Sequence, residues 1–374
     1  MSISLNADEK TLFKKLDWNF VVAILVLNFV GLINLYSATH GPHSETVETL
    51  FINQIIWLMI GWSCFFIVTF IDYQIVSKIC WGAYILNVLA LVFTATHGNI
   101  ALGAQRWINF GFFKYQPSET MKIAIIILLA HVLTHRQTDH DGMGIRGLIK
   151  PLLIVFIPFA IIVKQPDLGT AMMIAAISGT MIIFMKVKKW ILFLLASIAI
   201  VAAPIAWNYA LHDYQKNRIL TFISPTIDPK GTGYNSIQSK IAVGSGMFLG
   251  KGFRKGTQSQ LEFLPERHTD FIYSVLSEEH GFVGSILTLG LFCFLFLVGI
   301  RIASTARDKY GALLTVGILC YIFWHMFINI GMVIGLLPIV GVPLPLLSYG
   351  GSSMLTTMLG MGIVSSVAYR RFIF

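Results

Sequence analysis

The sequence predicts an all-α, polytopic integral membrane protein with about ten transmembrane helices and one long extracytoplasmic loop. Of the 374 residues, 56% are hydrophobic and only 12% are charged, and the mean hydropathy is +0.74. A soluble core of this size could not bury so many apolar side chains. We therefore expect residues 1–374 to form a single transmembrane domain. Its apolar runs are found at about residues 18–37, 51–71, 76–97, 119–134, 148–163, 168–186, 188–208, 270–300, 310–335 and 350–369.

Basic residues indicate how these helices are oriented in the membrane. They gather in small groups at the ends of alternate apolar runs, which is typical of cytoplasmic connections. We expect both termini in the cytoplasm, and we attribute the net charge of +9 to topology rather than to nucleic-acid binding. The basic residues then placed inside are Lys10, Lys14, Lys15, Lys78, Arg136, Arg146, Lys150, Lys186, Lys188, Lys189, Arg301, Arg307, Lys309, Arg370 and Arg371.

The amino-terminal segment and the cysteines give two further expectations. No small-residue cleavage site follows the first apolar run, so we predict a retained helix and not a removed secretory peptide. The cysteines Cys64, Cys80, Cys293 and Cys320 all lie inside apolar runs. They are expected to pack among other side chains and not to form disulfides or bind metal.

The second outer connection, residues 99–118, leads into a helix that carries two opposite charges. Glu119 and Lys122 lie three residues apart and therefore on one helix face, and Arg106 and Lys114 precede them. Two interpretations stay open. One is a local ion pair at a helix start with Ser118 as its cap. The other is a charged pair facing a polar cavity, because ionisable groups at membrane depth usually serve a function.

The third outer connection is a tight turn from Lys164 to Gly169. Pro166 and Gly169 interrupt an otherwise continuous apolar segment beside Lys164 and Asp167. A plain hairpin turn capped by Asp167 explains this pattern as well as a functional site does.

The fourth outer connection, residues 210–269, is far longer than a link between packed helices requires, and long ordered loops are usually functional. Tyr234, Ile237 and Ile241 fall on one face of a short helix, which we expect to lie along the outer membrane surface. A glycine-rich stretch from Gly244 to Gly256 follows. The spacing of its glycines is wrong for a nucleotide-binding P-loop.

Three cations, Lys251, Arg254 and Lys255, stand in this glycine-rich stretch. Exposed backbone amides together with these cations suit a diphosphate group. The alternative is a basic loop that is merely solvated, or one that contacts anionic lipid headgroups.

The loop ends at a group of ionisable residues directly before an apolar run. The group at this membrane boundary consists of Glu262, Glu266, Arg267, His268 and Asp270. From local sequence alone two interpretations of Asp270 weigh equally. It is either a catalytic carboxylate or a first-turn acid of a helix capped by Thr269, and a helix start would lower its pKa.

Two later segments are also unusual. Glu278 and Glu279 lie about 12 to 14 Å along the helix that follows, well within the bilayer, so they should face the protein interior. The last outer connection, from Gly335 to Ser353, is apolar but rich in proline and glycine, and it includes Ser348. Such backbone cannot span lipid as a regular helix, so we predict a re-entrant or cavity-lining segment.

Taken together, these motifs resemble the SEDS family of cell-wall polymerases, and they are most similar to its elongation, or rod-shape-determining, branch. The resemblance covers essentially the whole chain. The short amino-terminal tail and Arg267 between Glu266 and His268 favour the elongation branch over the division branch. The motifs that carry it are Gly103-Ala-Gln-Arg-Trp107, Gln116-Pro-Ser-Glu-Thr-Met-Lys122, Gln165-Pro-Asp-Leu-Gly-Thr170, Leu264-Pro-Glu-Arg-His-Thr-Asp-Phe271 and the segment from Gly335 to Ser353.

The resemblance implies a peptidoglycan glycosyltransferase that polymerises lipid II into glycan strands on the outer face of the bacterial plasma membrane. It implies Asp270 as the catalytic residue and a class B penicillin-binding protein as the transpeptidase partner. No permanent metal site is expected, and a Mg²⁺ or Mn²⁺ ion would arrive with the substrate diphosphate. The residues predicted to bind the substrate are Arg106, Lys114, Glu119, Lys122, Lys251, Arg254, Lys255, Arg267, His268 and Ser348.

Two alternatives come from other functional classes. A transporter that flips lipid II would be expected to place its charges near the midplane in discontinuous, pairwise related helices. Here the charges gather at outer helix ends and no internal repeat is evident, which favours the enzyme. A membrane scaffold that only recruits the transpeptidase would leave Lys122, Glu278 and Glu279 without an explanation.

Overall fold

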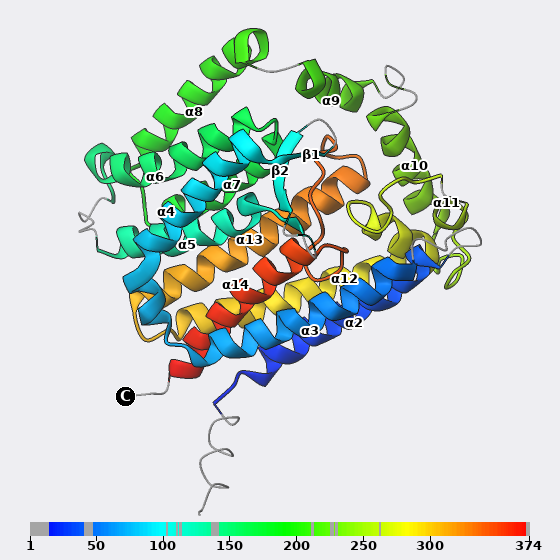
Figure 1. Ribbon diagram of the computed structural model, residues 1–374, viewed down its shortest axis with the longest axis horizontal. Helices are drawn as coiled ribbons and strands as arrows, with labels where there is room; N and C mark the ends of the chain where they lie inside the picture. Colours follow the sequence, from blue (N-terminus) through cyan, green and yellow to red (C-terminus); the bar gives the residue numbers. More distant parts are fainter. Residues whose placement is uncertain are drawn as a thin grey trace, which may run out of the picture.

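The computed structural model describes residues 15–40, 48–101, 104–109, 111, 114–135, 142–210, 213–224, 228, 231–261 and 263–371. These residues form a bundle of helices with one small sheet (Figure 1). Lys10, Lys14 and Arg136, which were used to predict the orientation, lie outside the described residues. The helices are α2 (Trp18–Thr39), α3 (Glu48–Phe70), α4 (Tyr73–His97), α5 (Pro117–Thr134), α6 (Ile145–Lys164), α7 (Leu168–Phe184), α8 (Lys189–Ile205), η1 (Ala206–Ala210), α9 (Asp213–Ile223), α10 (Thr232–Ser245), α11 (Thr257–Gln260), α12 (Ile272–Ser304), α13 (Lys309–Val333) and α14 (Gly351–Arg370).

All ten predicted apolar runs are helices in the structure. Within the described part of the chain, nine helices are long and apolar enough to cross a membrane, and α7 is a shorter apolar helix. The chain is therefore a multi-pass membrane protein, as its composition predicts. The four cysteines are free in the structure, and Cys80 is buried as expected for a packing residue, whereas Cys293 is exposed on the surface of α12.

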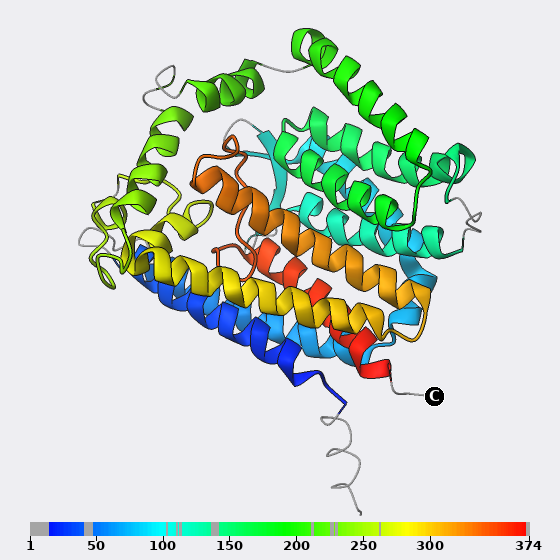
Figure 2. The ribbon, with the colours of Figure 1, turned by 180° about the vertical axis from the view of Figure 1, so that it is seen from behind.

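Helices α5, α13 and α14 form the centre of the bundle. Helix α5 is the most enclosed, with 83% of its apolar window buried, because it is apolar on nearly every side. It packs against α4, α7 and α13, while α14 packs along α3 and α12 packs along α2. Figures 1 and 2 show α2, α3, α12 and α14 running side by side along one edge of the molecule.

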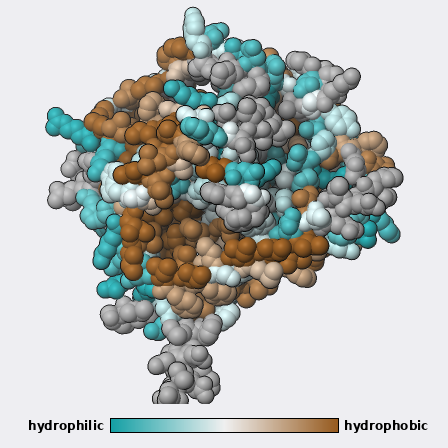
Figure 3. Space-filling view, viewed as in Figure 1, coloured by the Kyte–Doolittle hydropathy of each residue, from teal (hydrophilic) through white to brown (hydrophobic). Residues whose placement is uncertain are grey.

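The long loop between the seventh and eighth spans, which was predicted as residues 210–269, contains helices α9, α10 and α11. Helix α8 lies at the periphery, and α9 continues the chain from α8 toward α10 and α11 (Figures 1 and 2). Little of α8 is buried in the molecule. In Figure 3, apolar side chains cover much of the visible face of the bundle, and hydrophilic ones lie both along its left edge and on the side of α9 to α11.

A small antiparallel sheet occupies the second outer connection, where no strand had been predicted. Its strands are β1 (Asn99–Ala101), β2 (Ala104–Asn109) and β3 (Lys114–Tyr115), in the order β1-β2-β3. Asn99 pairs with Trp107, and Ile108 pairs with Tyr115. The sheet leads directly into α5 and thereby places Arg106 near the turn before α7.

At the opposite end of the bundle, Asp17 joins three helices. Its carboxylate caps the start of α2 and accepts hydrogen bonds from Arg301 at the end of α12 (2.7 Å) and from Arg371 after α14 (3.1 Å). Other predicted cytoplasmic cations, among them Lys309 at the start of α13 and Arg370 at the end of α14, stand at this same end of the helices.

Candidate active site

Asp270 lies in a turn directly before α12. The backbone amides of Thr269 and Phe271 both donate to the carbonyl of Glu266, whose φ of +53° lies in the left-handed region. Helix α12 begins at Ile272 with Phe271 at its N-cap and without a side-chain cap, and the Thr269 hydroxyl donates to Glu266 instead. The interpretation of Thr269 as a helix cap and Asp270 as a first-turn acid is therefore wrong.

The surroundings of Asp270 favour its protonated form. Burial is the main cause that raises the pKa of this carboxyl, and the nearby Glu266 carboxylate adds to it, while Arg218 acts in the opposite direction. The resulting pKa is about 7, so the expectation of a pKa lowered by a helix start is also wrong. A carboxylate with a pKa near neutral pH can accept a proton during a reaction.

Gly341 makes room beside this carboxylate. Its φ of +77° lies in the left-handed region, and a Cβ at this position would lie 3.2 Å from the Asp270 Oδ2 atom. A larger residue would therefore be strained and would crowd Asp270.

His268 and Arg267 both precede Asp270 in the chain, and their side chains contact different parts of the protein. The His268 ring lies edge-on to Tyr349, with centroids 6.0 Å apart, and its Nε2 is 3.9 Å from the Glu266 carboxylate. Burial lowers the pKa of His268, so the ring is mainly neutral at pH 7. Arg267 is buried, and its Nε donates to the carbonyl of Ala38 at the end of α2 (2.8 Å).

Residues 335–350, between α13 and α14, contain no helix, which confirms the prediction that this segment is not a regular helix. We call it the re-entrant segment after the predicted form, which stays a prediction. The Ser348 hydroxyl is buried and donates to the carbonyl of Thr269 (2.7 Å). In addition, the Arg218 guanidinium donates to the carbonyl of Val340 (3.0 Å). This segment thus lies between α9 and the turn that carries Asp270.

The glycine-rich stretch fills a break in α12. Gly281 interrupts the helix with a φ of +64°. The amides of Phe282 and Val283, which lose their partners within the helix at this break, donate to the carbonyls of Met247 (2.9 Å) and Phe248 (3.2 Å). The glycines therefore allow the backbone of this stretch to approach the backbone of α12 closely.

Backbone amides of the same stretch complete the upstream half of α12. Lys251 N donates to the carbonyl of Glu278 and Gly252 N donates to that of Glu279, both at 3.0 Å. A Cβ at Gly250 would lie 2.1 Å from the Glu279 carbonyl oxygen, so only glycine fits there. The prediction that these amides are exposed to a diphosphate is not met at Lys251 and Gly252.

The three cations of this stretch have different partners. Lys251 pairs with the fully buried Glu278 carboxylate (2.7 Å). The Arg254 guanidinium donates to the carbonyl of His40 at the end of α2 (2.7 Å). Lys255 is exposed. Glu278 faces the protein interior as predicted, and it also accepts hydrogen bonds from the first turn of α11.

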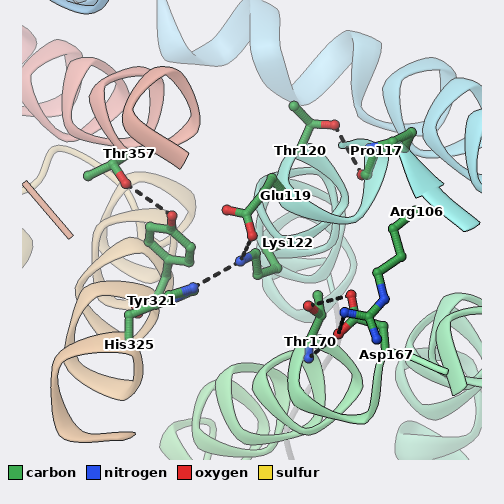
Figure 4. Close-up of polar contacts among 10 residues, drawn as sticks. All are labelled: Arg106, Pro117, Glu119, Thr120, Lys122, Asp167, Thr170, Tyr321, His325 and Thr357. Atoms are coloured by element: carbon green, nitrogen blue, oxygen red, sulfur yellow. Dashed lines mark hydrogen bonds and ion pairs between the residues drawn. The ribbon is translucent and has the colours of Figure 1, made fainter. Parts of the chain in front are cut away.

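A second ionisable group lies inside the bundle (Figure 4). The Lys122 Nζ atom is 2.7 Å from Glu119 Oε1 and 2.9 Å from His325 Nε2, and it stands over the ring of Tyr321. All four side chains are buried. The predicted ion pair therefore forms, but Ser118 does not cap the helix, since the N-cap is Gln116. A histidine within an apolar run was the signal that could have identified His325.

Arg106 and Asp167 meet at the start of α7, on the side of the bundle shown in Figure 4. The Asp167 carboxylate caps α7 through the Thr170 amide (3.3 Å), so the capped-turn interpretation is confirmed. The Arg106 guanidinium lies 3.7 Å from Asp167 and donates to the carbonyl of Pro166. The Lys114 side chain is exposed, and its carbonyl accepts a hydrogen bond from Ser352 (3.0 Å).

The structure thus gathers Asp270, His268 and Ser348 around one turn, together with Arg218, which the sequence alone did not single out. Glu119 and Lys122 form a separate buried group. Among the described residues, no group of three or more His, Cys, Asp or Glu side chains could hold a metal ion. Metal binding with the substrate diphosphate stays a prediction.

Comparison with known proteins places this arrangement in a family. The chain matches the cell cycle protein family FtsW/RodA/SpoVE over residues 17–372. It is 44% identical to the peptidoglycan glycosyltransferase MrdB of Escherichia coli (strain K12) over 289 residues, which is 77% of each chain. It is 30% identical to the peptidoglycan glycosyltransferase RodA of Treponema pallidum (strain Nichols), covering 95% of this chain and 98% of the relative.

Two solved structures have the same fold. One belongs to a peptidoglycan synthase complex that coordinates polymerization and crosslinking, with a TM-score of 0.81, 28% identity and coverage of 96% of this chain and 99% of that one. The other is the rod shape determining protein RodA of Thermus thermophilus, with a TM-score of 0.71, 24% identity and coverage of 96% and 98%. At that identity the second likeness concerns the fold alone.

Proposed function

Because the chain belongs to the FtsW/RodA/SpoVE family of cell cycle proteins, we propose that it is a peptidoglycan glycosyltransferase that polymerises lipid II during cell elongation. The relatives from Escherichia coli and Treponema pallidum carry the name of this activity. The observation that carries the proposal is Asp270, a carboxylate that caps no helix and whose pKa is raised to about 7.

Sugar transfer requires one base at this position. The 4-hydroxyl oxygen of the acceptor forms a bond to the anomeric carbon of the donor, and the bond from that carbon to the diphosphate oxygen breaks. The hydroxyl proton passes to the Asp270 carboxylate, and the lipid diphosphate leaves with the bonding electron pair. One displacement inverts an α-linked donor into a β-linked glycan, so no covalent enzyme intermediate is needed.

The diphosphate is an anion and requires positive charge nearby. Arg218 is the cation that lowers the pKa of Asp270, and we assign it to the leaving diphosphate together with Arg106. Lys255, which is exposed, and Arg254 attract the anionic substrate to the surface. Lys251 is paired with Glu278, so its contact with substrate would require that ion pair to open.

The residues at this site would supply only some of the ligands that a divalent cation needs. Asp270 and Glu266 are two carboxylates close enough to influence each other, and with diphosphate oxygens they would hold Mg²⁺ or Mn²⁺. Such an ion would neutralise charge on the leaving diphosphate. Among the described residues, no third carboxylate, histidine or cysteine groups with them, so the diphosphate oxygens would supply the remaining ligands.

We also propose a partner and a location. A class B penicillin-binding protein would supply the transpeptidase activity, and the structural neighbour from a peptidoglycan synthase complex supports such an assembly. The active site would face the outer leaflet of the bacterial inner membrane, with both termini in the cytoplasm. The grouping of basic residues at the opposite end of the bundle supports this orientation.

One observation favours a second function, lipid II transport. The buried group of Glu119, Lys122 and His325 lies inside the bundle, and ionisable residues at such positions often mark a transport path. A transporter would move fluorescent lipid II across vesicle membranes without polymerising it. The enzyme would polymerise lipid II as a purified protein.

Asp270→Asn tests the enzymatic proposal directly. The substitution preserves shape but removes the base, so polymerisation of lipid II by the purified chain with its partner should fall by about 10² to 10⁴. Expression and partner binding should stay unchanged. Asp213→Asn is the matched control, because Asp213 is an exposed carboxylate of the same outer loop. Near-normal glycan formation by Asp270→Asn would refute the assignment.

A further inference from the structure

We propose that Asn329 and Ser348 are positioning residues that clamp the turn carrying Asp270 against α13 and the re-entrant segment. The inference rests on the proposed role of Asp270 in sugar transfer. The clamp consists of hydrogen bonds from outside the turn to three consecutive backbone carbonyls, those of residues 268, 269 and 270.

Two of these hydrogen bonds come from the re-entrant segment. The Tyr349 amide donates to the carbonyl of His268 (3.0 Å), and the Ser348 hydroxyl donates to that of Thr269 (2.7 Å). The same Ser348 oxygen accepts a hydrogen bond from the amide of Leu344 (2.8 Å). The Ser348 hydroxyl therefore joins the two segments, because it accepts a hydrogen bond from the re-entrant backbone and donates one to the turn.

The third hydrogen bond comes from α13. The Asn329 Nδ2 atom donates to the carbonyl of Asp270 (2.8 Å) and also to that of Val342 (2.7 Å). One side-chain amide thus connects the catalytic turn, the re-entrant segment and the helix that carries it. No apolar side chain of similar size could make this connection.

The two atoms of the Asn329 amide group differ in their contacts, and the difference indicates that the site uses its Nδ2 hydrogen-bond donor. The side chain is fully buried, and its Oδ1 atom has no hydrogen-bond partner among the residues that the structure describes. Burying an unpaired acceptor costs free energy, whereas an apolar residue would fill the same space without that cost. The two hydrogen bonds from Nδ2 are the compensating gain, and both fix the backbone around Asp270.

The clamp is itself braced from the opposite side. Gln54 on α3 donates to the carbonyl of Ser348 and accepts from the amide of Gly350, both at 3.3 Å. Asn34 on α2 donates to the carbonyl of Ile272 at the start of α12 (2.8 Å). Because the backbone is held on both sides of Asp270, its carboxylate is presented at a fixed place, which general-base catalysis requires.

Asn329→Ala and Ser348→Ala test the clamp in the full-length protein bound to its partner, with lipid II as substrate. We expect kcat to fall about 10- to 100-fold with little change in KM, because the carboxylate is misplaced while the cations assigned to the diphosphate stay, and the Ser348 hydroxyl is already bonded to backbone groups. We also expect the rise of kcat/KM with pH, which is the acid limb of the profile, to move to lower pH. A loosened turn would admit water to Asp270, and hydration would lower the pKa that burial raises. The charged groups that face Asp270, namely Glu266 and Arg218, and the neighbouring His268 stay unchanged in both variants.

Two further variants control the experiment. Ser348→Thr retains the hydroxyl and should recover most of the lost kcat. Asn28→Ala removes a buried asparagine of α2 that also has an unpaired Oδ1 but contacts Met358 instead of the turn, so it should leave kcat and the acid limb unchanged.

The outcomes separate the clamp from the proposed function. If Asn329→Ala and Ser348→Ala keep the wild-type kcat and acid limb while Asp270→Asn is inactive, the clamp is overturned and the function stands. A loss of folded protein with normal kcat per folded molecule would show a purely structural role and would equally overturn the clamp. An active Asp270→Asn would contradict the proposed function itself.

Discussion

Single residues in this protein show how burial changes the chemistry of a charge. Lys122 is enclosed in the bundle and meets both Glu119 and His325 at hydrogen-bond distance. Removing one member of such a pair would leave an unpaired buried charge, which typically costs about 3 to 5 kcal/mol. Asp270 shows the opposite case, because burial beside another carboxylate raises its pKa to about 7.

Glu266→Gln and Arg218→Gln should shift the pH dependence of activity in opposite directions. Only the ionised form of Asp270 accepts a proton, so the rate should rise with pH through about 7. Glu266 raises the pKa of Asp270, so its removal should move this rise to lower pH. Arg218 lowers the pKa, and its removal should move the rise to higher pH.

The measurement is the polymerisation rate at limiting lipid II as a function of pH. The shift for Glu266→Gln should be modest, because Glu266 is exposed and solvent screens its charge. Shifts of the two variants in the same direction would show that Asp270 is not the group that controls the acid limb.

At the level of elements, α12 is two helices joined through another segment. The glycine-rich stretch supplies carbonyls to the amides after the break and amides to the carbonyls before it. Backbone groups within a membrane must be hydrogen-bonded, and here the loop that precedes α12 supplies the missing hydrogen-bond partners. The outer loop and the start of α12 are therefore one packed unit.

Gly281→Ala should destabilise this unit. A φ of +64° with a ψ of −157° is a conformation that essentially only glycine adopts, so alanine would cost about 1 to 3 kcal/mol, and its Cβ would lie 2.3 Å from the amide nitrogen of Gly250. We expect a lower thermal midpoint in detergent and faster proteolysis within residues 231–261. Gly290→Ala is the control on the same helix.

No atom lies within 4 Å of a Cβ placed at Gly290. Alanine is the better helix former by about 1 kcal/mol, so the midpoint should stay or rise slightly. Equal thermal midpoints and equal proteolysis for the Gly281 variant and wild type would contradict the tight contact between loop and helix.

At the scale of the whole molecule, charge is distributed unequally between the two ends of the bundle. Asp17, Arg301 and Arg371 join helix ends on one side, and the turn with Asp270 lies on the other. Synthesis of glycan outside the cell requires the Asp270 side to face outward. The positive-inside rule predicts this orientation from the basic connections alone.

Cysteine labelling tests the orientation. Lys255→Cys in intact cells should react with a membrane-impermeant maleimide, and Lys309→Cys should react only after the membrane is permeabilised. Both lysines are exposed in the structure, so access from the solvent is comparable. The native cysteines lie in apolar helices and should give low background. Labelling of Lys309→Cys in intact cells would reverse the proposed topology.

The membrane architecture and the main segments could be predicted from the sequence. Runs of about twenty apolar residues must be helices in lipid, and the proline- and glycine-rich segment from Gly335 cannot be one. These conclusions depend on local composition, which a single sequence displays fully. The role of Asp270 could not be predicted from local sequence alone, because the pattern equally favoured a catalytic carboxylate and a first-turn acid of a helix capped by Thr269. The family resemblance is what favoured the catalytic interpretation.

The contacts that hold the site together could not be predicted from the sequence, because they join residues that are distant in the chain. Asn329 and Asp270 are 59 residues apart, and Lys122 and His325 are 203 apart, so no local pattern pairs them. The glycine-rich stretch was predicted to offer its amides to a ligand, but the break in α12 uses those of Lys251 and Gly252. Every buried backbone group needs a partner, and which segment supplies it depends on the packing of the whole bundle.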